Sequence, residues 1–239
     1  MSDKLDKVIE WMIDFKKKNN VKGVVLGLSG GKDSTVVAML AKKVFGNNVV
    51  AVSMPNGRQA DITDVQEIIQ VLKLNATTFN IKNTFDQLIY DTHLTITDKA
   101  KTNIAPRIRM TALYAIAQSL GFLVIGTGNK SEAMIGWTTK FGDSACDFNP
   151  IGHLTCREVI SIGLELADEF GLDRSYIVKK PADGLTNKTD EDNFGFTYDE
   201  LDNYLIYGIE GPNIEKIKNM ITWAAHKRRM PLKVEEYTV

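Results

Sequence analysis

The sequence is poor in cysteine, because only Cys146 and Cys156 occur among its 239 residues. Two cysteines cannot build a disulfide framework, and they suit a reducing compartment. No apolar run is long enough to cross a bilayer, and the charged residues between Met1 and Lys18 exclude a signal peptide there. The formal net charge of -1 provides no general positive field for nucleic acid. These absences predict a cytoplasmic protein that binds neither nucleic acid nor membranes.

The composition is that of an ordinary globular protein, with 44% hydrophobic and 25% charged residues. A chain of this length can bury one large core, so we expect a single domain over residues 1–239. Short β-rich runs alternate with longer amphipathic stretches. We expect strands at residues 23–28, 49–54, 77–81 and 122–125, and helices at 5–15, 36–44, 65–72, 103–120, after 129, and at 155–170, 198–207 and 213–227.

Two helix boundaries rest on single residues. Gly46 is expected to end the second helix, and Asn103 is expected to cap a helix with Pro106 in its tolerant first turn. Residues 181–196 are polar and irregular, which predicts a loop. The repeated strand–helix–strand units favour a Rossmann-like three-layer α/β sandwich, with a mostly parallel sheet and helices on both faces. Ligands bind beyond the carboxyl ends of the strands in such sheets.

A glycine-rich turn follows the first strand and precedes a helix. Its glycines let the backbone approach an anion closely, and the helix adds unpaired N–H groups and a positive dipole end. Lys32 adds positive charge, whereas Asp33 would repel phosphate unless Mg²⁺ binds both. We therefore predict a phosphate site with Mg²⁺, although a turn that needs glycine for geometry alone is the alternative. The residues expected to contact the phosphates are Gly27, Leu28, Ser29, Gly30, Gly31, Lys32, Asp33 and Ser34.

This turn matches neither Gly-x-x-x-x-Gly-Lys-Ser/Thr nor Gly-x-Gly-x-x-Gly. It resembles the pyrophosphate loop of the ATP-pyrophosphatase superfamily, in which ATP is cleaved between its α- and β-phosphates. Several later segments resemble the NAD synthetase family, in the family's order and over nearly the whole chain. These segments are residues 103–110, 126–132, 139–143, 147–150, 180–181, 189–191 and 226–228.

The resemblance implies an ammonia-dependent NAD synthetase, which is an ATP-dependent amide-forming ligase. ATP adenylates the nicotinate carboxylate of deamido-NAD and releases pyrophosphate, and ammonia then displaces AMP to give NAD. Acyl-AMP supplies the good leaving group that a carboxylate lacks. Charge accumulates on phosphate oxygens, so we expect metal and lysine or arginine groups to dominate catalysis.

The resemblance also assigns roles residue by residue. It implies that Asp33 and Glu132 bind Mg²⁺, that Lys32 and Asp33 are catalytic, and that Thr127 contacts ATP. Taken alone, Glu132 is better explained as a solvated acid that favours the start of its helix, and the preceding Gly-Thr-Gly-Asn turn and the resemblance reverse this preference. The implied contacts with deamido-NAD are Arg107, Lys140, Asp147, His226 and Lys227.

Some of these assignments have an alternative in the residues themselves. Arg107 and Arg109 differ by about 200° around a helix, so both cannot face one ligand. The resemblance favours Arg107, and we expect Arg109 to be a surface or salt-bridged residue. His226 and Lys227 also suit the last turn of a helix, where cations complement the dipole.

The chain departs from the family pattern at two positions. The family usually has a lysine nine residues after the aspartate that matches Asp147, and Cys156 stands there in this chain. A thiol cannot replace an ammonium group at a phosphate, and Arg157 is the neighbouring candidate to do so. Ala182 stands where a serine or threonine is common, which removes any hydroxyl contact.

Two other functions remain open on this sequence. One is a different ligase of the ATP-pyrophosphatase superfamily, and the other is a non-catalytic ATP-binding module. Too little chain lies outside the resemblance for a glutaminase domain, so free ammonia is the expected nitrogen source. The resemblance also implies a homodimer with its substrate sites near the subunit interface.

Overall fold

The computed structural model describes residues 2–57, 62–179, 189–231 and 233. Its sheet is formed by four parallel strands in the order β3-β2-β1-β4. The strands are β1 (Val24–Gly27), β2 (Val49–Ser53), β3 (Asn75–Thr78) and β4 (Leu123–Val124). The expected Rossmann-like α/β fold with a parallel sheet is therefore confirmed.

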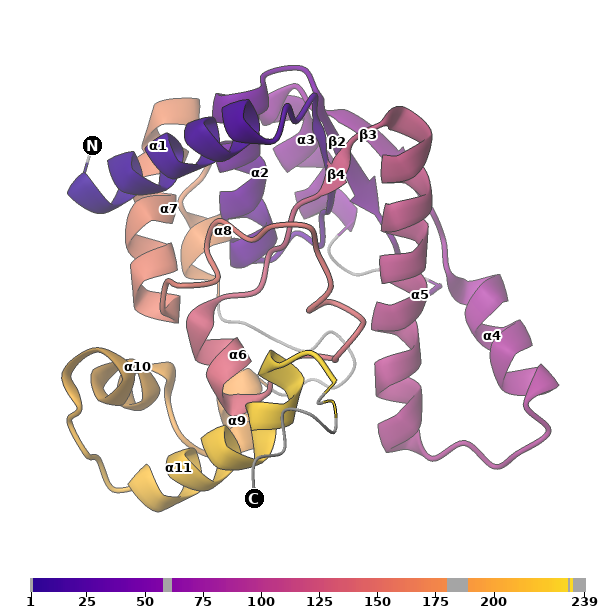
Figure 1. Cartoon of the computed structure of the whole chain (residues 1–239), viewed down its shortest axis with the longest axis vertical. Coiled ribbons are helices and arrows are strands. Elements are labelled where there is room, and N and C mark those ends of the chain that lie inside the picture. Colours follow the sequence, from indigo (N-terminus) through magenta and orange to yellow (C-terminus); the bar gives the residue numbers. More distant parts are fainter. Residues whose placement is uncertain (1, 58–61, 180–188, 232, 234–239) are drawn as a thin grey trace.

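Helices surround this sheet and form a separate group at the C-terminal end of the chain (Figure 1). They are α1 (Asp3–Lys18), α2 (Lys32–Phe45), α3 (Ile62–Leu72), α4 (Lys82–Asp91), α5 (Asp98–Leu120), α6 (Lys130–Ile135), α7 (Cys156–Phe170), α8 (Ser175–Val178), α9 (Asp190–Phe194), α10 (Tyr198–Tyr207), α11 (Ile214–Trp223) and the 3-10 helix η1 (Ala224–Arg228).

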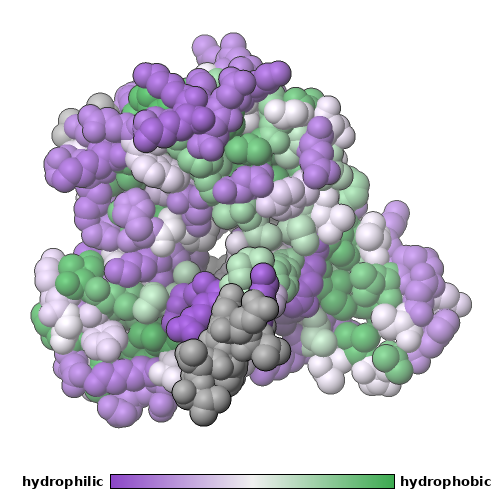
Figure 2. Space-filling view, viewed as in Figure 1, coloured by the Kyte–Doolittle hydropathy of each residue, from purple (hydrophilic) through white to green (hydrophobic). Residues whose placement is uncertain are grey.

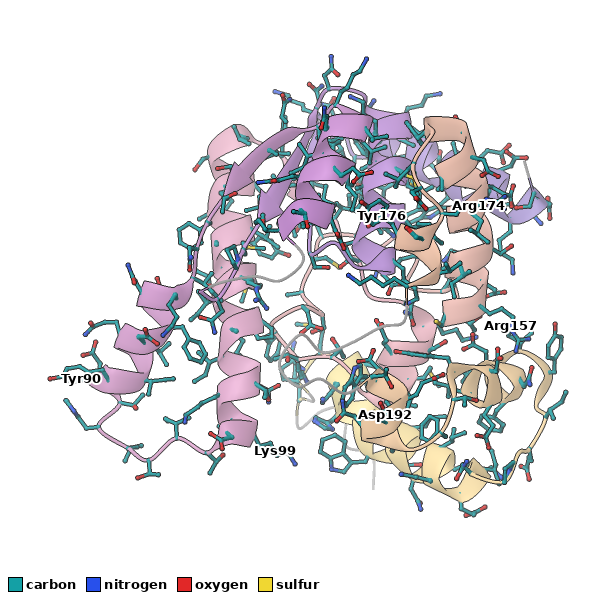
Figure 3. All side chains as sticks on the ribbon, turned by 180° about the vertical axis from the view of Figure 1, so that it is seen from behind. Tyr90, Lys99, Arg157, Arg174, Tyr176 and Asp192 are labelled. Atoms are coloured by element: carbon teal, nitrogen blue, oxygen red, sulfur yellow. The ribbon has the colours of Figure 1, made fainter. Side chains whose placement is uncertain are left out.

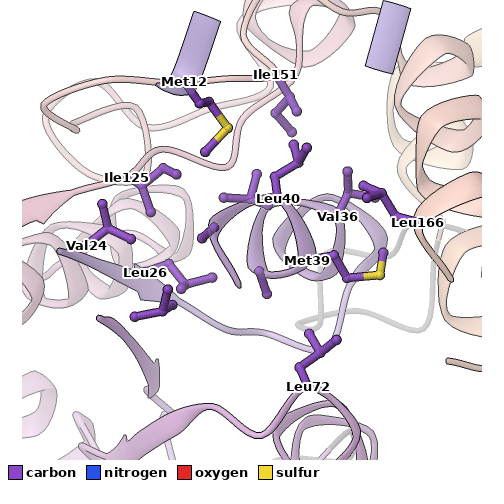
Figure 4. Close-up of a cluster of buried hydrophobic side chains, with 14 of the residues drawn as sticks. Met12, Val24, Leu26, Val36, Met39, Leu40, Leu72, Ile125, Ile151 and Leu166 are labelled. Carbon is purple, nitrogen blue, oxygen red and sulfur yellow. The ribbon is translucent and has the colours of Figure 1, made fainter. Parts of the chain in front are cut away.

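Side chains of the strands alternate between the two faces of the sheet, as the period of a strand requires. Val24 and Leu26 pack into a large core with α1, α2, α3 and α7. Val25 and Val52 pack into a second core with α4 and α5. Figure 4 shows part of the first core, in which Leu26 of β1 and Leu40 of α2 are among the buried side chains. The sheet is thus the middle one of three layers.

A third apolar cluster joins α6, α9, α10 and α11 below the sheet in Figure 1. Phe194 lies at its centre and is in ring contact with Trp137, Phe196 and Tyr198. Burying large aromatic side chains provides much of the stabilisation of such a cluster. Cys156, the first residue of α7, also belongs to it. This cluster therefore connects the C-terminal helices to the helices that surround the sheet.

The order of the strands creates a switch point next to β1. From β1 the chain goes through α2 to β2 on one side, and it later returns to β4 on the other side. The loops that follow β1 and β4 therefore leave the sheet at the same edge and diverge. An open parallel sheet binds ligands at such a point.

The expected start of the long helix was wrong. α5 begins at Asp98, and the side chain of Thr97 caps it by accepting a hydrogen bond from the N–H group of Ala100. Pro106 consequently lies inside the helix, where it removes only one backbone donor. Asn103 lies inside this helix and does not cap it. Its side-chain oxygen accepts a hydrogen bond from the Thr139 hydroxyl at 2.9 Å.

Other boundaries also differ from the expectation. β3 covers Asn75–Thr78 instead of residues 77–81, and all four of its residues are exposed, so no apolar pattern marked it. The helices α4 and α8 were missed. Helix α9 occupies part of the expected loop at 181–196, and residues 181–188 of that loop lie outside the described residues. Within the described part of the chain, none of the helices is long and apolar enough to cross a membrane.

Candidate active site

The turn after β1 is held in shape by its own hydroxyl groups. The Ser29 hydroxyl accepts a hydrogen bond from the Gly31 N–H group at 3.2 Å and lies 3.0 Å from the Ser34 hydroxyl. Gly30 has a φ of 83°, which a side chain would disfavour. Gly31 is the N-cap of α2 and provides no side-chain cap, so the first N–H groups of this helix can bind an anion.

Lys32 is a buried cation at the first position of α2. Its side chain is only 2% exposed, and its ammonium group lies 2.6 Å from a carboxylate oxygen of Asp33. Burial lowers the pKa of Lys32, but the negative charges of Asp33 and Glu132 outweigh burial and raise it above its usual value. Lys32 therefore remains an ammonium ion among these acids.

The turn after β4 brings a second acid to the same place. Asn129 caps α6, and its side-chain oxygen accepts a hydrogen bond from the N–H group of Glu132 at 2.9 Å. The amide nitrogen of Asn129 donates to Asp33 Oδ1 at 3.2 Å. A single buried asparagine thus fixes both turns, and it places Asp33 and Glu132 at one edge of the sheet.

The environment of Glu132 disfavours its charge. Desolvation, followed by the negative charge of Asp33, raises the pKa of Glu132 to about 8. Two carboxylates that share a site in this way favour a cation between or beside them. Asp33 and Glu132 supply the oxygen ligands that Mg²⁺ prefers. Their chemistry fits the expected metal, and Lys32 already provides one positive charge there.

Sequence reasoning gave no role to Asp190 and Tyr198, which lie beside this site. Asp190 is 4% exposed and accepts a hydrogen bond from the Tyr198 hydroxyl at 3.1 Å. The Lys32 ammonium lies 5.6 Å from the centre of the Tyr198 ring. Segment 189–191 belongs to the family resemblance, so that match was the signal that could have pointed to Asp190. Tyr198 had no comparable signal.

A second group of cations lies where α6, the following loop and η1 meet. The Lys227 ammonium donates hydrogen bonds to the carbonyl oxygens of Gly136 at 2.7 Å and Thr138 at 2.8 Å. Lys140 donates to the carbonyl oxygen of His226 at 2.7 Å. Arg107 reaches the carbonyl oxygen of Lys140 at 3.3 Å. The structure therefore brings four expected substrate contacts together: Arg107, Lys140, His226 and Lys227.

A hollow of about 280 Å³ opens beside these side chains. Lys140, His226 and Arg229 line it together with Met230 and Pro231. Cationic and apolar groups in one hollow suit a ligand with both phosphate and ring surfaces. In the same view as Figure 1, Figure 2 shows that the surface is also hollowed between the sheet layers and the C-terminal helices.

The model of the family described as NAD synthase matches residues 4–231. The chain therefore belongs to the NAD synthase family. Ammonia-dependent NAD synthetases from Finegoldia magna and Mesoplasma florum are 37% and 38% identical to this chain. The alignments cover 92% and 99% of this chain and 90% and 98% of those relatives.

Solved structures of the family show the same fold. The NMN synthetase from Francisella tularensis is 33% identical, with a TM-score of 0.88 and coverage of 97% of both chains. The ammonia-dependent NAD synthetase from Campylobacter jejuni, in complex with the nitrate ion, is 33% identical with a TM-score of 0.78. That comparison covers 98% of this chain and 99% of the other. The expected family, ligase class and ammonia-dependent activity are confirmed.

Asp147 and Thr127 are also expected at the site, but no described contact joins them to the acids around Lys32 or to the cations around Lys227. Asp147 accepts hydrogen bonds from the Val124 N–H group at 2.7 Å and from the Tyr114 hydroxyl at 3.5 Å. It therefore fastens the segment after Cys146 to β4. Thr127 follows β4 and precedes Asn129, so it lies in the turn at the edge where Asp33 lies.

Arg109 is not the surface or salt-bridged residue that we expected. Its Nε donates to the carbonyl oxygen of Met54 at 2.9 Å, just beyond the end of β2. Burial lowers the pKa of its guanidinium group, although Asp143 opposes this effect. Arg107 donates instead to the carbonyl oxygen of Lys140, so the two arginines contact different parts of the chain, in agreement with their spacing on the helix.

Arg157 does not take the place of the missing family lysine. Its guanidinium group lies 3.0 Å from both Asp199 Oδ1 and Asn203 Oδ1 of α10. Figure 3 shows Arg157 at the outside of the molecule, beside α10. Cys156 is 3% exposed, and burial raises its pKa to about 12, so the thiol is neutral. Ala182 lies outside the described residues.

Proposed function

We propose that this chain adenylates the carboxylate of deamido-NAD with ATP and then transfers the acyl group to ammonia. The turn that joins β1 to α2 carries this proposal, because it presents uncapped N–H groups beside a buried ammonium ion and two carboxylates. An anion is stabilised at such a helix start. The triphosphate of ATP is the anion that the family's chemistry requires.

Asp33 and Glu132 are the residues that would hold Mg²⁺. Their carboxylates supply hard oxygen ligands, and Asn129 holds them at one edge of the sheet. The ion would neutralise charge on the phosphates during adenylation. Lys32 adds a further positive charge at the same edge, where it stabilises the pyrophosphate that departs. Thr127 lies in the adjoining turn and is proposed to contact ATP.

The residues of the second group are proposed to bind deamido-NAD. Lys140 and His226 line the hollow, and Arg107 and Lys227 belong to the same group of residues. The phosphates of the substrate are complementary in charge to the arginine and the two lysines. Asp147 is retained as a substrate contact from the family resemblance alone. Holding the nicotinate carboxylate next to the α-phosphate converts a bimolecular reaction into an intramolecular one.

Atoms and charges balance in both steps. A carboxylate oxygen attacks the α-phosphorus of ATP. The bond between this phosphorus and the oxygen that bridges to the β-phosphate breaks, which releases pyrophosphate. Ammonia then attacks the acyl carbon, loses a proton, and displaces AMP with the electrons of the acyl–oxygen bond. Neither step requires a side-chain nucleophile. The protein's task is to position the reactants and to stabilise phosphate charge.

One assay tests this function. Purified protein is incubated with ATP, Mg²⁺, ammonium and deamido-NAD, and NAD, AMP and pyrophosphate are measured. We expect the three products in equal amounts. Pyrophosphate formed only with a different acid would show another ligase of the superfamily. ATP binding without any product would show a binding module.

A second acceptor is tested as well, because one of the similar solved structures is an NMN synthetase. The solved NMN synthetase from Francisella tularensis has a TM-score of 0.88, against 0.78 for the Campylobacter jejuni enzyme at the same identity. Nicotinate mononucleotide would present the same carboxylate without the adenylate half. The assay should therefore be repeated with this acceptor. A higher kcat/KM for the mononucleotide than for the dinucleotide would make it the substrate.

We also propose that the chain acts as a cytoplasmic homodimer. Helix α5 has 23 residues, of which only Ala105 and Ala117 are buried in the single chain, and apolar residues lie on several of its sides. A second copy would cover such a surface. Sedimentation at working concentration tests this state, and a monomer that retains full activity would contradict it.

A further inference from the structure

The loop that follows α6 contains a tight turn whose conformation does not suit its residues. The Gly142 N–H group donates to the carbonyl oxygen of Thr139 at 2.9 Å, which closes a turn over four residues. Of these four residues, Phe141 is the one with a positive φ, at 59°. A positive φ at the third residue is the mark of a type II turn, which favours glycine or asparagine at that position. Phenylalanine is therefore strained there.

The glycine of this turn is needed at the following position. A Cβ at Gly142 would lie 2.9 Å from the Cβ of Pro106 and 2.9 Å from Thr139 Cγ2. Neighbouring side chains also fix the turn. The Thr139 N–H group donates to Asp143 Oδ1 at 2.8 Å, and the Thr139 hydroxyl donates to Asn103 at 2.9 Å. A strained residue persists only where the surrounding structure determines its conformation in this way.

Burial does not explain phenylalanine at this position either, because Phe141 is 49% exposed. The structure describes three other non-glycine residues with a positive φ, Asn20, Lys73 and His93, and all of them are polar. Polar residues, and asparagine in particular, are the ordinary occupants of this conformation. Neither the local backbone nor packing within the single chain thus accounts for an aromatic side chain at position 141.

The ring of Phe141 lies beside the group of residues that is proposed to bind the acceptor. The Lys140 ammonium lies 5.3 Å from the centre of this ring, and it also donates to the carbonyl oxygen of His226 at 2.7 Å. Lys140 and His226 line the hollow of about 280 Å³. An ammonium group and a half-exposed aromatic ring side by side match a ligand that carries both a phosphate and a flat ring. A nucleotide is such a ligand.

We infer that Phe141 is a binding residue for the acceptor: its ring stacks on an aromatic ring of the nucleotide, while the Lys140 ammonium contacts a phosphate. The inference rests on the proposed function, because that function supplies the nucleotide. Deamido-NAD offers two flat rings, nicotinate and adenine, and both stack by the same chemistry. The strain of the turn is retained because it presents the ring to the ligand.

The test exchanges the ring for a residue that suits the turn. Phe141→Asn removes the ring and tolerates the positive φ, Phe141→Leu keeps an apolar side chain, and Phe141→Tyr keeps the ring. Lys73→Asn is the matched control, because it makes the same kind of change at an exposed residue with a φ of 48° directly after α3.

Four measurements are made on each protein. Titration calorimetry without ATP gives the affinity for deamido-NAD and for nicotinate mononucleotide. Initial rates of NAD formation give kcat and KM. Thermal unfolding gives the stability, and sedimentation gives the oligomeric state.

We expect Phe141→Asn to bind deamido-NAD about 10-fold more weakly, since a stacking contact is lost. Its KM should rise while kcat changes by less than about 2-fold, because stacking stabilises the bound ground state and the transition state alike. Phe141→Tyr should match wild type, and Phe141→Leu should lie between the two. Phe141→Asn and Lys73→Asn should both unfold about 2 °C higher than wild type, since asparagine relieves the backbone strain. Lys73→Asn should keep the wild-type affinity.

Weaker binding of both nucleotides assigns the stack to the nicotinate ring, and weaker binding of the dinucleotide alone assigns it to adenine. Wild-type affinity of Phe141→Asn for both nucleotides overturns the inference. A Phe141→Asn protein that sediments as a smaller species than wild type also overturns it, because the ring would then belong to a subunit contact. Wild type that binds deamido-NAD but forms no NAD contradicts the proposed function instead, and the affinities still decide the inference.

Discussion

The ammonium group of Lys227 donates a hydrogen bond to the carbonyl oxygen of Gly136, 2.7 Å away. Gly136 ends α6, the short helix whose first turn carries Glu132. A Cβ at Gly136 would lie 2.6 Å from the Cβ of Ala224, so η1 and α6 are in direct contact. The C-terminal segment is therefore attached to the helix that presents a proposed metal ligand.

Lys227→Met tests this attachment. Methionine keeps an apolar chain over Trp223 but leaves two carbonyl oxygens without their donor. We expect the free energy of unfolding to fall by about 1–2 kcal/mol and KM for the acceptor to rise. Urea denaturation and initial rates measure the two effects. Lys7→Met, at an exposed ion pair, is the control and should change stability by less than about 0.5 kcal/mol. Wild-type stability in Lys227→Met would show that the contact contributes nothing.

Asp33→Asn should abolish turnover. The amide has nearly the shape of the carboxylate, but it lacks the charge that binds Mg²⁺ and pairs with Lys32. We expect the rate of NAD formation to fall by at least about 100-fold while the protein remains folded. Asp14→Asn removes an exposed carboxylate of α1 and serves as the control. Near-normal activity of Asp33→Asn would remove this residue from the metal site.

Glu132 gives the metal-free protein a specific pH dependence. Its pKa rises from an ordinary 4.5 to about 8 in the folded protein, first through desolvation and then through the charge of Asp33. Between these values the folded state binds more protons at this group than the unfolded state. The contribution of Glu132 to stability is thus present below pH 4.5 and is lost as pH rises through 8.

Glu132→Gln removes this dependence. We expect urea denaturation in EDTA to show that wild type loses more stability than the variant between pH 5.5 and about 8. The difference between the two proteins reports on Glu132 together with its electrostatic interactions with Asp33 and Lys32. Parallel pH curves for the two proteins would contradict the raised pKa.

Gly163→Val tests the close packing of α2 and α7. The new Cβ would meet Val36 at 2.6 Å and Ile177 at 2.9 Å, both buried side chains that have little room to move. Such overpacking costs about 1–3 kcal/mol, which denaturant unfolding will measure. Ser161→Ala, at an exposed position of the same helix, is the control, with an expected change below about 0.5 kcal/mol. A Gly163→Val variant as stable as this control would show that the helices can separate freely.

The sequence predicted the sheet well because its central strands carry strong local signals. Val24–Gly27 and Val49–Ser53 are mostly buried, valine-rich runs that end in turns. β3 was displaced because its residues are exposed and its position depends on pairing with β2. The start of α5 was misplaced because Pro106 was placed in the first turn of the helix and the cap at Thr97 was not considered.

The site residues also fall into two groups, those that a local sequence pattern indicates and those that only the folded chain brings together. Asp33 and Glu132 could be placed at one edge of the sheet because each follows a strand in a recognisable turn, and their role as metal ligands stays a prediction that the resemblance implies. The contact of Asn129 with Asp33, and of Tyr198 with Lys32, joins residues that are far apart in the sequence, so only the folded chain shows them. Arg109 was misjudged for the same reason, because its partner is a backbone carbonyl oxygen of another element.

Gly31 leaves the start of α2 without the side-chain cap that Asn129 gives to α6 and Thr197 gives to α10. A glycine at the cap costs a helix only a few tenths of a kcal/mol relative to asparagine or threonine, and a bound anion can accept hydrogen bonds from the N–H groups that no side chain caps. Folding and occupancy are then thermodynamically linked, and the folded fraction grows with the ratio of ATP concentration to Kd. A cell that runs short of ATP would therefore hold this enzyme in a less stable form, more readily unfolded and degraded.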